Sequence, residues 1–287
     1  MNVNKITLTD RSYPAKLTNI AVPPKTLFYI GDIAPLTTMP VVSIVGSRAV
    51  TPYGKQVSTR FAGELASRGI AIVSGLALGV DALAHHAALE AGGSTAAVLP
   101  SPVTAIYPAS NRQLAKRIVE QGGALISEYG QDDRSEAFKA RFIERNRLVS
   151  GLADVLLITE ASEKSGTMHT ANFALEQGKT VMAVPGNITS PTSAGTNNLI
   201  KAGALPVTDV SDILTALGLD GKQLQLEILA ANAEEEVILA LLGKGITDSA
   251  ILLAQSEMAS PIFNQTLTML EITGKIKPLG SAPCCLR

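Results

Sequence analysis

Residues 41–75 read VVSIVGSRAVTPYGKQVSTRFAGELASRGIAIVSG, and this stretch decides the fold. Two short apolar runs, 41–46 and 70–75, are rich in Val and Ile and do not alternate with polar residues. Such runs are typical of strands that are buried on both faces. An amphipathic stretch of helical length lies between them and ends in Gly69, a common helix C-cap. A strand–helix–strand unit of this length predicts a parallel sheet with helices on both faces.

The same alternation of apolar runs and helical stretches continues along the chain, which predicts an α/β domain over residues 1–218. Four further apolar runs follow, at 94–100, 124–129, 154–160 and 180–186. Residues 1–40 are looser and proline-rich before the apolar run TLFYIG, so we expect a lead-in segment that packs on the domain and can add an edge strand.

The composition shifts near residues 217–223, and we expect a second domain over 222–287. Three short helical stretches precede a short strand there, which suggests a winged-helix-like module. This segment has 5 Lys+Arg and 7 Asp+Glu, a charge of −2, while the whole chain carries −1. The sequence therefore does not indicate a broadly basic surface, and a nucleic-acid binder of this net charge needs a local cationic site.

The sequence shows no sign of a membrane or secreted protein. The N-terminus lacks the apolar core of a signal peptide, and no apolar run has the length of a membrane span. The two cysteines, Cys284 and Cys285, are adjacent and cannot staple a fold. We expect a cytoplasmic protein.

Three strand ends carry small-residue turns that lead into helices. They are Gly46-Ser47-Arg48, the segment 74–81 with Gly75 and Asp81, and Ser165-Gly166-Thr167 followed by Thr170. Ligands of open parallel sheets bind outside the carboxyl ends of strands, where unpaired helix N–H groups favour phosphate. A single such turn is often only tight packing, but three of them together with an arginine predict an anion-binding crevice. Asp81 is expected to orient its turn.

Standard nucleotide and metal motifs do not fit this crevice. The first turn departs from G-x-G-x-x-G, and no G-x-x-x-x-G-K-[ST] motif occurs. The three histidines have no Cys or carboxylate cluster at ligand spacing, so neither a metal nor a cofactor is expected.

Residues 138–150 predict a helix that carries several cations beside an aromatic ring and an amide. Lys139, Phe142 and Asn146 share one helix face, and Arg141 and Arg145 form an adjoining stripe. Cations interleaved with an aromatic ring suit single-stranded nucleic acid, which is held by phosphate contacts and base stacking. The alternative is that the phenylalanine is core and that the arginines at 145 and 147 pair with Glu144, Glu160 or a neighbour.

From about residue 12 to 215 the chain resembles the DNA-processing protein A family. The resembling segments are YPAKL, PPKTLFYIG, VGSRAVTPYG, SGLALGVDALAHHAAL, YPASN, ISEY, FIERNRLVSGLADVLLITEASEKSGTMHTANFALEQGKTVMAVPG and AGTNNLIKAGA. The C-terminal helical segment is similar to the winged-helix module of many members. The resemblance implies an extended Rossmann-like fold and sequence-independent binding of single-stranded DNA. It also implies a homodimer that protects incoming DNA in natural transformation and loads a RecA-type recombinase onto it.

On this chain the resemblance implies phosphate binding by Arg48, and a cation and a stacking ring from Lys139 and Phe142. The full set of predicted DNA-binding residues is Gly46, Ser47, Arg48, Gly75, Lys139, Phe142, Arg145, Asn146, Arg147, Ser165, Gly166, Thr167 and Thr170. The turn Pro100-Ser101-Pro102 departs from the family's glycine-rich turn, and its prolines remove backbone donors from that wall of the crevice.

Two other functions compete with this one. Lysine-decarboxylase-like phosphoribohydrolases carry P-G-G-x-G-T-x-x-E in a similar crevice, but Thr170 stands where that motif has its glutamate, and a hydroxyl cannot replace the carboxylate. A nucleotide sensor with the winged helix as its output would bind mononucleotides tightly and oligomers weakly. We therefore predict a single-strand binder that is not an enzyme.

Overall fold

The computed structural model describes residues 2–131, 133, 138–219, 232–243, 246, 248–273, 276–278 and 284–286. The chain forms two compact units, residues 1–224 and 225–287.

The first unit is built on a nine-stranded sheet in the order β1-β2-β6-β5-β4-β3-β7-β8-β9. Its strands are β1 (Asn4–Thr7), β2 (Thr26–Gly31), β3 (Val41–Val45), β4 (Ala71–Ser74), β5 (Thr95–Val98), β6 (Ala124–Ser127), β7 (Val155–Ile158), β8 (Thr180–Ala183) and β9 (Leu205–Pro206). From β6 to β9 all neighbouring strands run parallel. The predicted mostly parallel sheet is confirmed, and each of the six apolar runs contains one of its strands.

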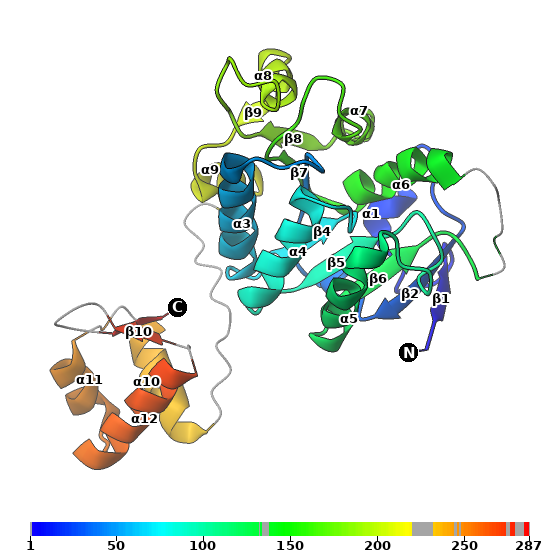
Figure 1. The fold of residues 1–287 in the computed structure, drawn as a ribbon. Helices are drawn as coiled ribbons and strands as arrows, with labels where there is room; N and C mark the ends of the chain where they lie inside the picture. Colours follow the sequence, from blue (N-terminus) through cyan, green and yellow to red (C-terminus); the bar gives the residue numbers. More distant parts are fainter. Residues whose placement is uncertain are drawn as a thin grey trace. The chain divides into compact units, whose positions relative to one another are not determined.

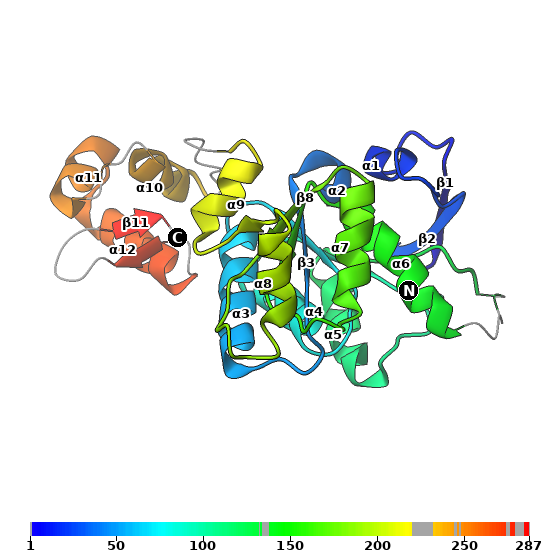
Figure 2. The same cartoon turned by 90° about the horizontal axis from the view of Figure 1, so that it is seen from above.

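The lead-in segment adds two edge strands. β2 pairs antiparallel with β6, and β1 pairs antiparallel with β2. Figure 2 shows these strands at one end of the first unit, opposite α9 (Val210–Ala216), which packs beside α3 (Pro52–Ala66).

Helices cover both faces of the sheet (Figure 1). The remaining helices of the first unit are α1 (Ala15–Thr18), α2 (Pro35–Thr38), α4 (Val80–Glu90), η1 (Ala109–Asn111), α5 (Arg112–Glu120), α6 (Phe138–Leu152), α7 (Thr167–Glu176) and α8 (Ala194–Lys201). Along β3 the side chains of Val42 and Ile44 pack against α3 and α4. Val41 and Val45 point to the other face, which α6 and α7 cover. A strand covered on both faces is apolar at every position, which explains the uninterrupted runs in the sequence.

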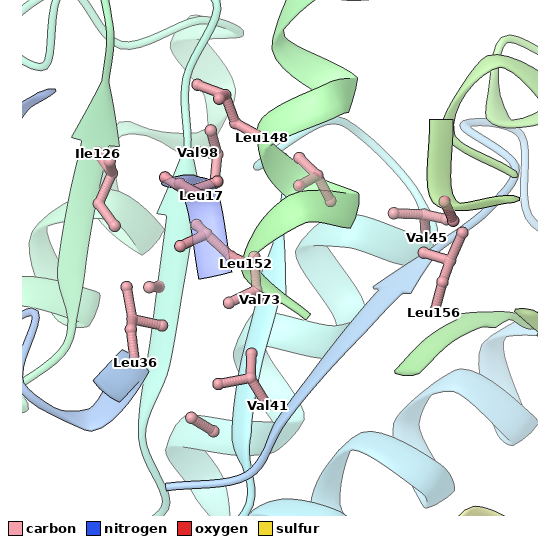
Figure 3. Packing of buried hydrophobic residues seen from close by; sticks show 14 of the residues in the cluster. Leu17, Leu36, Val41, Val45, Val73, Val98, Ile126, Leu148, Leu152 and Leu156 are labelled. Carbon is pink, nitrogen blue, oxygen red and sulfur yellow. The ribbon is translucent and has the colours of Figure 1, made fainter. Parts of the chain in front are cut away.

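The helix α6 lies across several strands on the face of the sheet to which Val41 and Val45 point. Figure 3 shows Leu148 and Leu152 of α6 among side chains from the sheet, including Val73, Val98 and Ile126. This packing fixes the helix that carries Phe142 and Arg145 relative to the carboxyl ends of the central strands.

The second unit contains α10 (Ala233–Gly243), α11 (Ser249–Ser256), α12 (Ser260–Ile272) and an antiparallel pair, β10 (Ile276–Pro278) and β11 (Cys284–Leu286). It has its own small core, in which Ile238, Leu252, Phe263 and Leu270 are buried. Three helices followed by a two-stranded ribbon are the elements expected of a winged helix. Among the residues described in either unit, no helix combines the length and apolar character needed to cross a bilayer.

Candidate functional site: a crevice at the carboxyl ends of the central strands

A pocket of about 380 Å³ lies at the carboxyl edge of the sheet. It lies where the turns after β3, β4 and β7 meet α6. Its lining residues are Val45, Gly46, Arg48, Gly75, Ala77, Asp81, Phe142, Ile143, Arg145, Asn146, Val149, Ser165, Gly166, Thr167, His169 and Thr170. The structure thus brings together the three small-residue turns that the sequence predicted to share one crevice.

The turn after β3 is held against the end of β7. A Cβ added at Gly46 would lie 2.7 Å from Cγ2 of Val80 and 2.8 Å from the carbonyl oxygen of Glu160, so no side chain fits there. The backbone N–H of Ser47 donates to that same Glu160 oxygen at 2.7 Å. The chain then turns outward, and Arg48 is exposed at the pocket.

The turn after β4 is organised by the carboxylate of Asp81 at the start of α4. This carboxylate accepts hydrogen bonds from the backbone N–H groups of Gly75 at 3.1 Å and Ala77 at 3.3 Å. Burial raises the pKa of Asp81, while the nearby guanidinium of Arg145 and these N–H donors lower it. Asp81 orients its turn, as the sequence indicated. Asn111, which the sequence analysis missed, supports the turn by donating from Nδ2 to the carbonyl oxygen of Leu76 at 2.9 Å.

Arg145 connects α6 to two of these strands from inside the protein. It is 3% exposed, and Nη1 donates to the carbonyl oxygen of Gly75 at 2.5 Å and also to that of Val98. Burial lowers the pKa of Arg145 to about 10, with the carboxylate of Asp81 opposing the shift. The guanidinium lies so close to Gly75 that a Cβ there would be 2.5 Å from Nη1. Arg145 therefore lines the pocket, while its Nη1 donates to backbone carbonyl oxygens.

The other arginines of α6 turn away from the pocket. Arg141 is buried, pairs with Asp133, and lies with its guanidinium carbon 4.3 Å from the ring centroid of Tyr129. Arg147 pairs with Glu128 at 2.5 Å. The sequence left open that arginines of this helix pair with carboxylates of the same chain. The structure shows such pairs, although the carboxylates are not those of Glu144 or Glu160. Direct DNA contact by Arg145 and Arg147 stays a prediction.

Phe142 is half-buried and belongs to an aromatic and cationic group at the pocket. The guanidinium carbon of Arg48 lies 5.4 Å from the centroid of its ring. The ring of Tyr107 meets it edge-on, with centroids 5.5 Å apart and the planes at 77°. Tyr107 is 48% exposed and was not predicted as a site residue. It comes close to Phe142 only through the fold, because 35 positions separate the two in sequence and no periodic pattern connects them.

The turn after β7 contributes hydroxyl groups and the first turn of α7. The hydroxyl of Ser165 donates to Oγ1 of Thr167 at 2.9 Å, and Oγ1 of Thr167 donates to the carbonyl oxygen of Gly46 at 3.1 Å. This second bond ties the third turn to the first. Gly166 precedes α7, and the first N–H groups of this helix donate within the turn: that of Thr167 to Oγ of Ser165 at 3.2 Å, and that of Met168 to the carbonyl oxygen of Ser165 at 3.0 Å. Thr170, one turn further along α7, is 3% exposed.

Three predicted site residues are not part of this pocket lining. Ser47 and Arg147 have the backbone and Glu128 contacts given above, and the side chain of Lys139 lies outside the described residues. Pocket residues that the sequence analysis did not assign to DNA binding are Val45, Ala77, Asp81, Ile143, Val149 and His169. Ile143 directly follows Phe142 and His169 directly precedes Thr170, and this proximity to predicted residues is the signal that could have indicated them.

The turn Pro100-Ser101-Pro102 does not contribute to the pocket lining. The hydroxyl of Ser101 is occupied, since it donates to the carbonyl oxygen of Ala105 at 2.7 Å. The missing proline donors therefore do not weaken a described wall of the pocket. Throughout the described part of the chain, no group of three or more His, Cys, Asp or Glu side chains is placed to hold a metal ion.

Comparison with known proteins identifies the family of the chain. The family model of DNA recombination-mediator protein A matches residues 4–218. Protein Smf of Escherichia coli is 41% identical over 216 residues, covering 75% of this chain and 57% of that protein. DNA processing protein DprA of Bacillus subtilis is 38% identical over 215 residues, covering 75% of this chain and 71% of that protein. The chain thus spans little more than half the length of the Escherichia coli relative.

Solved structures show the same relationship in three dimensions. DNA processing protein A of Streptococcus pneumoniae superposes with a TM-score of 0.68 at 35% identity, covering 75% of this chain and 74% of that one. The Helicobacter pylori protein, studied for its single-stranded DNA binding mode, gives 0.67 at 36% identity, covering 76% and 97%. These neighbours share the Rossmann-like fold of the first unit. By sequence and by structure, this chain belongs to the family of DNA recombination-mediator protein A.

Proposed function

We propose that this protein binds single-stranded DNA in the pocket at the carboxyl ends of β3, β4 and β7. In this proposal it acts in DNA processing during natural transformation and recombination, where it protects incoming single strands and loads a RecA-type recombinase onto them. It works in the cytoplasm as a homodimer and catalyses no reaction. Family membership supports the cellular role, and the geometry of the pocket supports the ligand.

The observation that carries the proposal is the placement of Arg48 beside Phe142. Arg48 is exposed, and no salt bridge joins it to a carboxylate of the described residues. Its charge is available to a phosphate. Phe142 is supported by Tyr107 on its edge, which makes a preset ring for a base to stack on. A phosphate and the adjoining base of one nucleotide need these two groups side by side.

The charge balance of the pocket also favours an anion. The pocket lining contains two arginines, Arg48 and Arg145, and one carboxylate, Asp81. Arg145 and Asp81 are both buried, which raises the pKa of Asp81 and lowers that of Arg145, and the attraction between their charges opposes both shifts. Arg48 is left as the uncompensated charge, next to the N-terminus of α7. This leaves a locally cationic site on a chain of net charge −1.

The lining gives little support to glycosidic hydrolysis. Thr170 stands where phosphoribohydrolases carry their glutamate, and it is buried. The carboxylate of Asp81 already accepts from two backbone N–H groups of its own turn. A base at that position would be held away from a substrate, which fits a binding pocket better than a catalytic one.

The test is fluorescence anisotropy with oligo-dT of graded length at several salt concentrations, comparing wild type with Arg48→Ala and Phe142→Ala. The matched control is Arg68→Ala, because Arg68 lies beyond the end of α3, at the amino edge of the strands, and its side chain is 40% exposed. Single strands lose about 0.7 in log–log salt slope for each phosphate contact removed. We therefore expect a slope shallower by about 0.7 for Arg48→Ala and unchanged for the control.

Phe142→Ala removes a stacking contact of about 1–3 kcal/mol, so we expect roughly 5- to 150-fold weaker binding with the salt slope retained. Equal loss in Arg48→Ala and Arg68→Ala would show non-specific attraction in place of a site. Tight binding of free nucleotides together with no binding of oligomers would refute the proposal and favour a nucleotide sensor or a hydrolase.

A further inference from the structure

A second pocket lies at the same carboxyl edge of the sheet and has no role in the function proposed above. Its volume is about 410 Å³. Its lining comes from the first turn of α3 and from the loop after β8: Thr51, Tyr53, Pro185, Gly186, Asn187, Ser190, Thr192 and Ser193. We call it the Tyr53 pocket.

The two pockets share one connecting segment. Gly46 and Arg48 line the first pocket, and Thr51 and Tyr53 line the second. The five peptide units that join Arg48 to Tyr53 can span at most about 17 Å. A strand whose phosphate sits at Arg48 therefore reaches the Tyr53 pocket within a few nucleotides.

Tyr53 is presented as a fixed, accessible ring. It is 45% exposed, although it is a large aromatic side chain. Its hydroxyl donates to the carbonyl oxygen of Pro185 at 2.8 Å, which anchors the far end of the ring to the opposite loop. An anchored ring loses little conformational freedom when a flat ligand stacks on it, so the stacking energy is retained in the affinity.

The loop after β8 supplies a hydroxyl at the pocket that has no partner in the described part of the protein. Ser193 is 6% exposed and precedes α8, yet its side chain does not cap that helix. Its Oγ has no hydrogen-bond partner among the residues that the structure describes. A Cβ added at Gly186 would lie 2.2 Å from this Oγ, so the glycine leaves the hydroxyl room beside the pocket. Oγ of Ser193 is not among the fully buried unpaired atoms of the described residues, so this hydroxyl is accessible from the pocket and can form a hydrogen bond with a ligand.

The charge of this pocket selects a neutral group over a phosphate. Glu160 already occupies the N-terminus of α3, where its carboxylate accepts from the backbone N–H of Thr51 at 3.1 Å and from the hydroxyl of Thr51. A second anion there would meet a buried carboxylate. A ring with polar edges suits an aromatic platform flanked by hydroxyl groups.

We propose that the Tyr53 pocket receives a base of the same single strand whose phosphate is held at Arg48, with the base stacked on Tyr53 and an edge atom hydrogen-bonded to Ser193. This inference rests on the proposed function and extends the DNA path along the carboxyl edge from β4, β3 and β7 to β8.

The experiment combines affinity with a direct contact readout. Wild type, Tyr53→Ala, Tyr53→Phe and Arg48→Ala are titrated into oligo-dT of increasing length, with circular dichroism spectra recorded to verify folding. Oligo-dT with a single 5-iododeoxyuridine is then photocrosslinked to wild type at each position and the attached residue is mapped by mass spectrometry. We expect Tyr53→Ala to match wild type on the shortest strands that bind and to bind longer ones roughly 5- to 150-fold more weakly.

Tyr53→Phe keeps the ring and should stay within about threefold of wild type, since it loses only the anchoring bond. Crosslinks should map to Tyr53 for iodinated positions a few nucleotides from the one that maps to Phe142. If Arg48→Ala weakens binding while Tyr53→Ala equals wild type at every length and no crosslink maps to Tyr53, this inference fails and the proposed function stands. If wild type binds no single-stranded DNA, the proposed function itself fails.

Discussion

His85 provides the sharpest test of the energetics of the first unit, through the dependence of stability on pH. It lies fully buried in α4, with Nδ1 2.7 Å from Oγ1 of Thr95. The hydroxyl of Thr95 donates to the carbonyl oxygen of Ile72 at 2.8 Å, so it accepts from Nδ1–H of the histidine. Nε2 is buried and has no partner in the described structure. A proton on Nε2 would therefore place an unpaired charge in the core.

Burial lowers the pKa of His85 to about 3, and the charges of His86 and Arg145 add to the effect. The unfolded chain has a histidine pKa of about 6.5. Below pH 6.5 the unfolded state therefore binds a proton that the native state does not, and the stability present above that pH is lost as pH falls toward 3. At pH 5 the gap of about 1.5 pH units corresponds to a loss of about 2 kcal/mol.

The assay is urea unfolding at pH 7 and pH 5, followed by tyrosine fluorescence. The chain has no Trp, and its five Tyr residues all lie within residues 1–224, so the signal reports the first unit. Wild type is compared with His85→Leu, which fills the site with an apolar side chain and leaves the bond from Thr95 to Ile72 in place. Carboxylates titrate in both proteins and cancel in the comparison.

We expect wild type to lose about 2 kcal/mol more than His85→Leu between pH 7 and pH 5. Equal losses in the two proteins would refute the reasoning, because they would show that His85 is either protonated in the native state or accessible to water.

Two further substitutions test the supports of the pocket. Arg145→Met leaves Asp81 buried without its cation. We expect the free energy of unfolding, measured by urea titration, to fall by about 3–5 kcal/mol. A loss below about 1 kcal/mol would contradict a structural role for Arg145. Gly79→Ala forces a Cβ to 2.2 Å from the carbonyl oxygen of Ser47 at a φ of +76°, and Gly92→Ala has a similar φ of +70° with nothing within 4 Å. We expect Gly92→Ala to cost about 1 kcal/mol, and Gly79→Ala to cost more and also to weaken DNA binding; equal effects would argue against the clash.

Much of the fold could be predicted because its strands are buried on both faces. The apolar runs at 41–46, 70–75 and 154–160 each coincide with a central strand, since a two-sided core requires apolar residues at consecutive positions. The edge strands of the sheet were harder to predict. The lead-in was expected to add one edge strand and adds two, and β9 (Leu205–Pro206) is too short to produce a periodic pattern.

The site could be predicted where it consists of turns and not where it depends on side-chain direction. The three small-residue turns meet because parallel strands all end at one edge of the sheet. The cations of α6 illustrate the difficulty. Arg141 and Arg145 were expected to form a stripe beside Phe142, yet Arg141 pairs with Asp133 and Arg145 donates to backbone carbonyls. A run of charged residues in a sequence does not show which of its side chains pair with other groups of the same protein.

The sequence by itself determined the order of strands and helices, the three turns at one edge, and the absence of the common nucleotide-binding motifs, since local patterns encode burial and turn chemistry. Only the tertiary structure decided which charges remain free. It buried Arg145 beside Asp81, left Arg48 exposed against Phe142, and brought Tyr107 and Tyr53 to the carboxyl edge. Such contacts join residues far apart in the chain, and their energies depend on distance and burial, which no local pattern records.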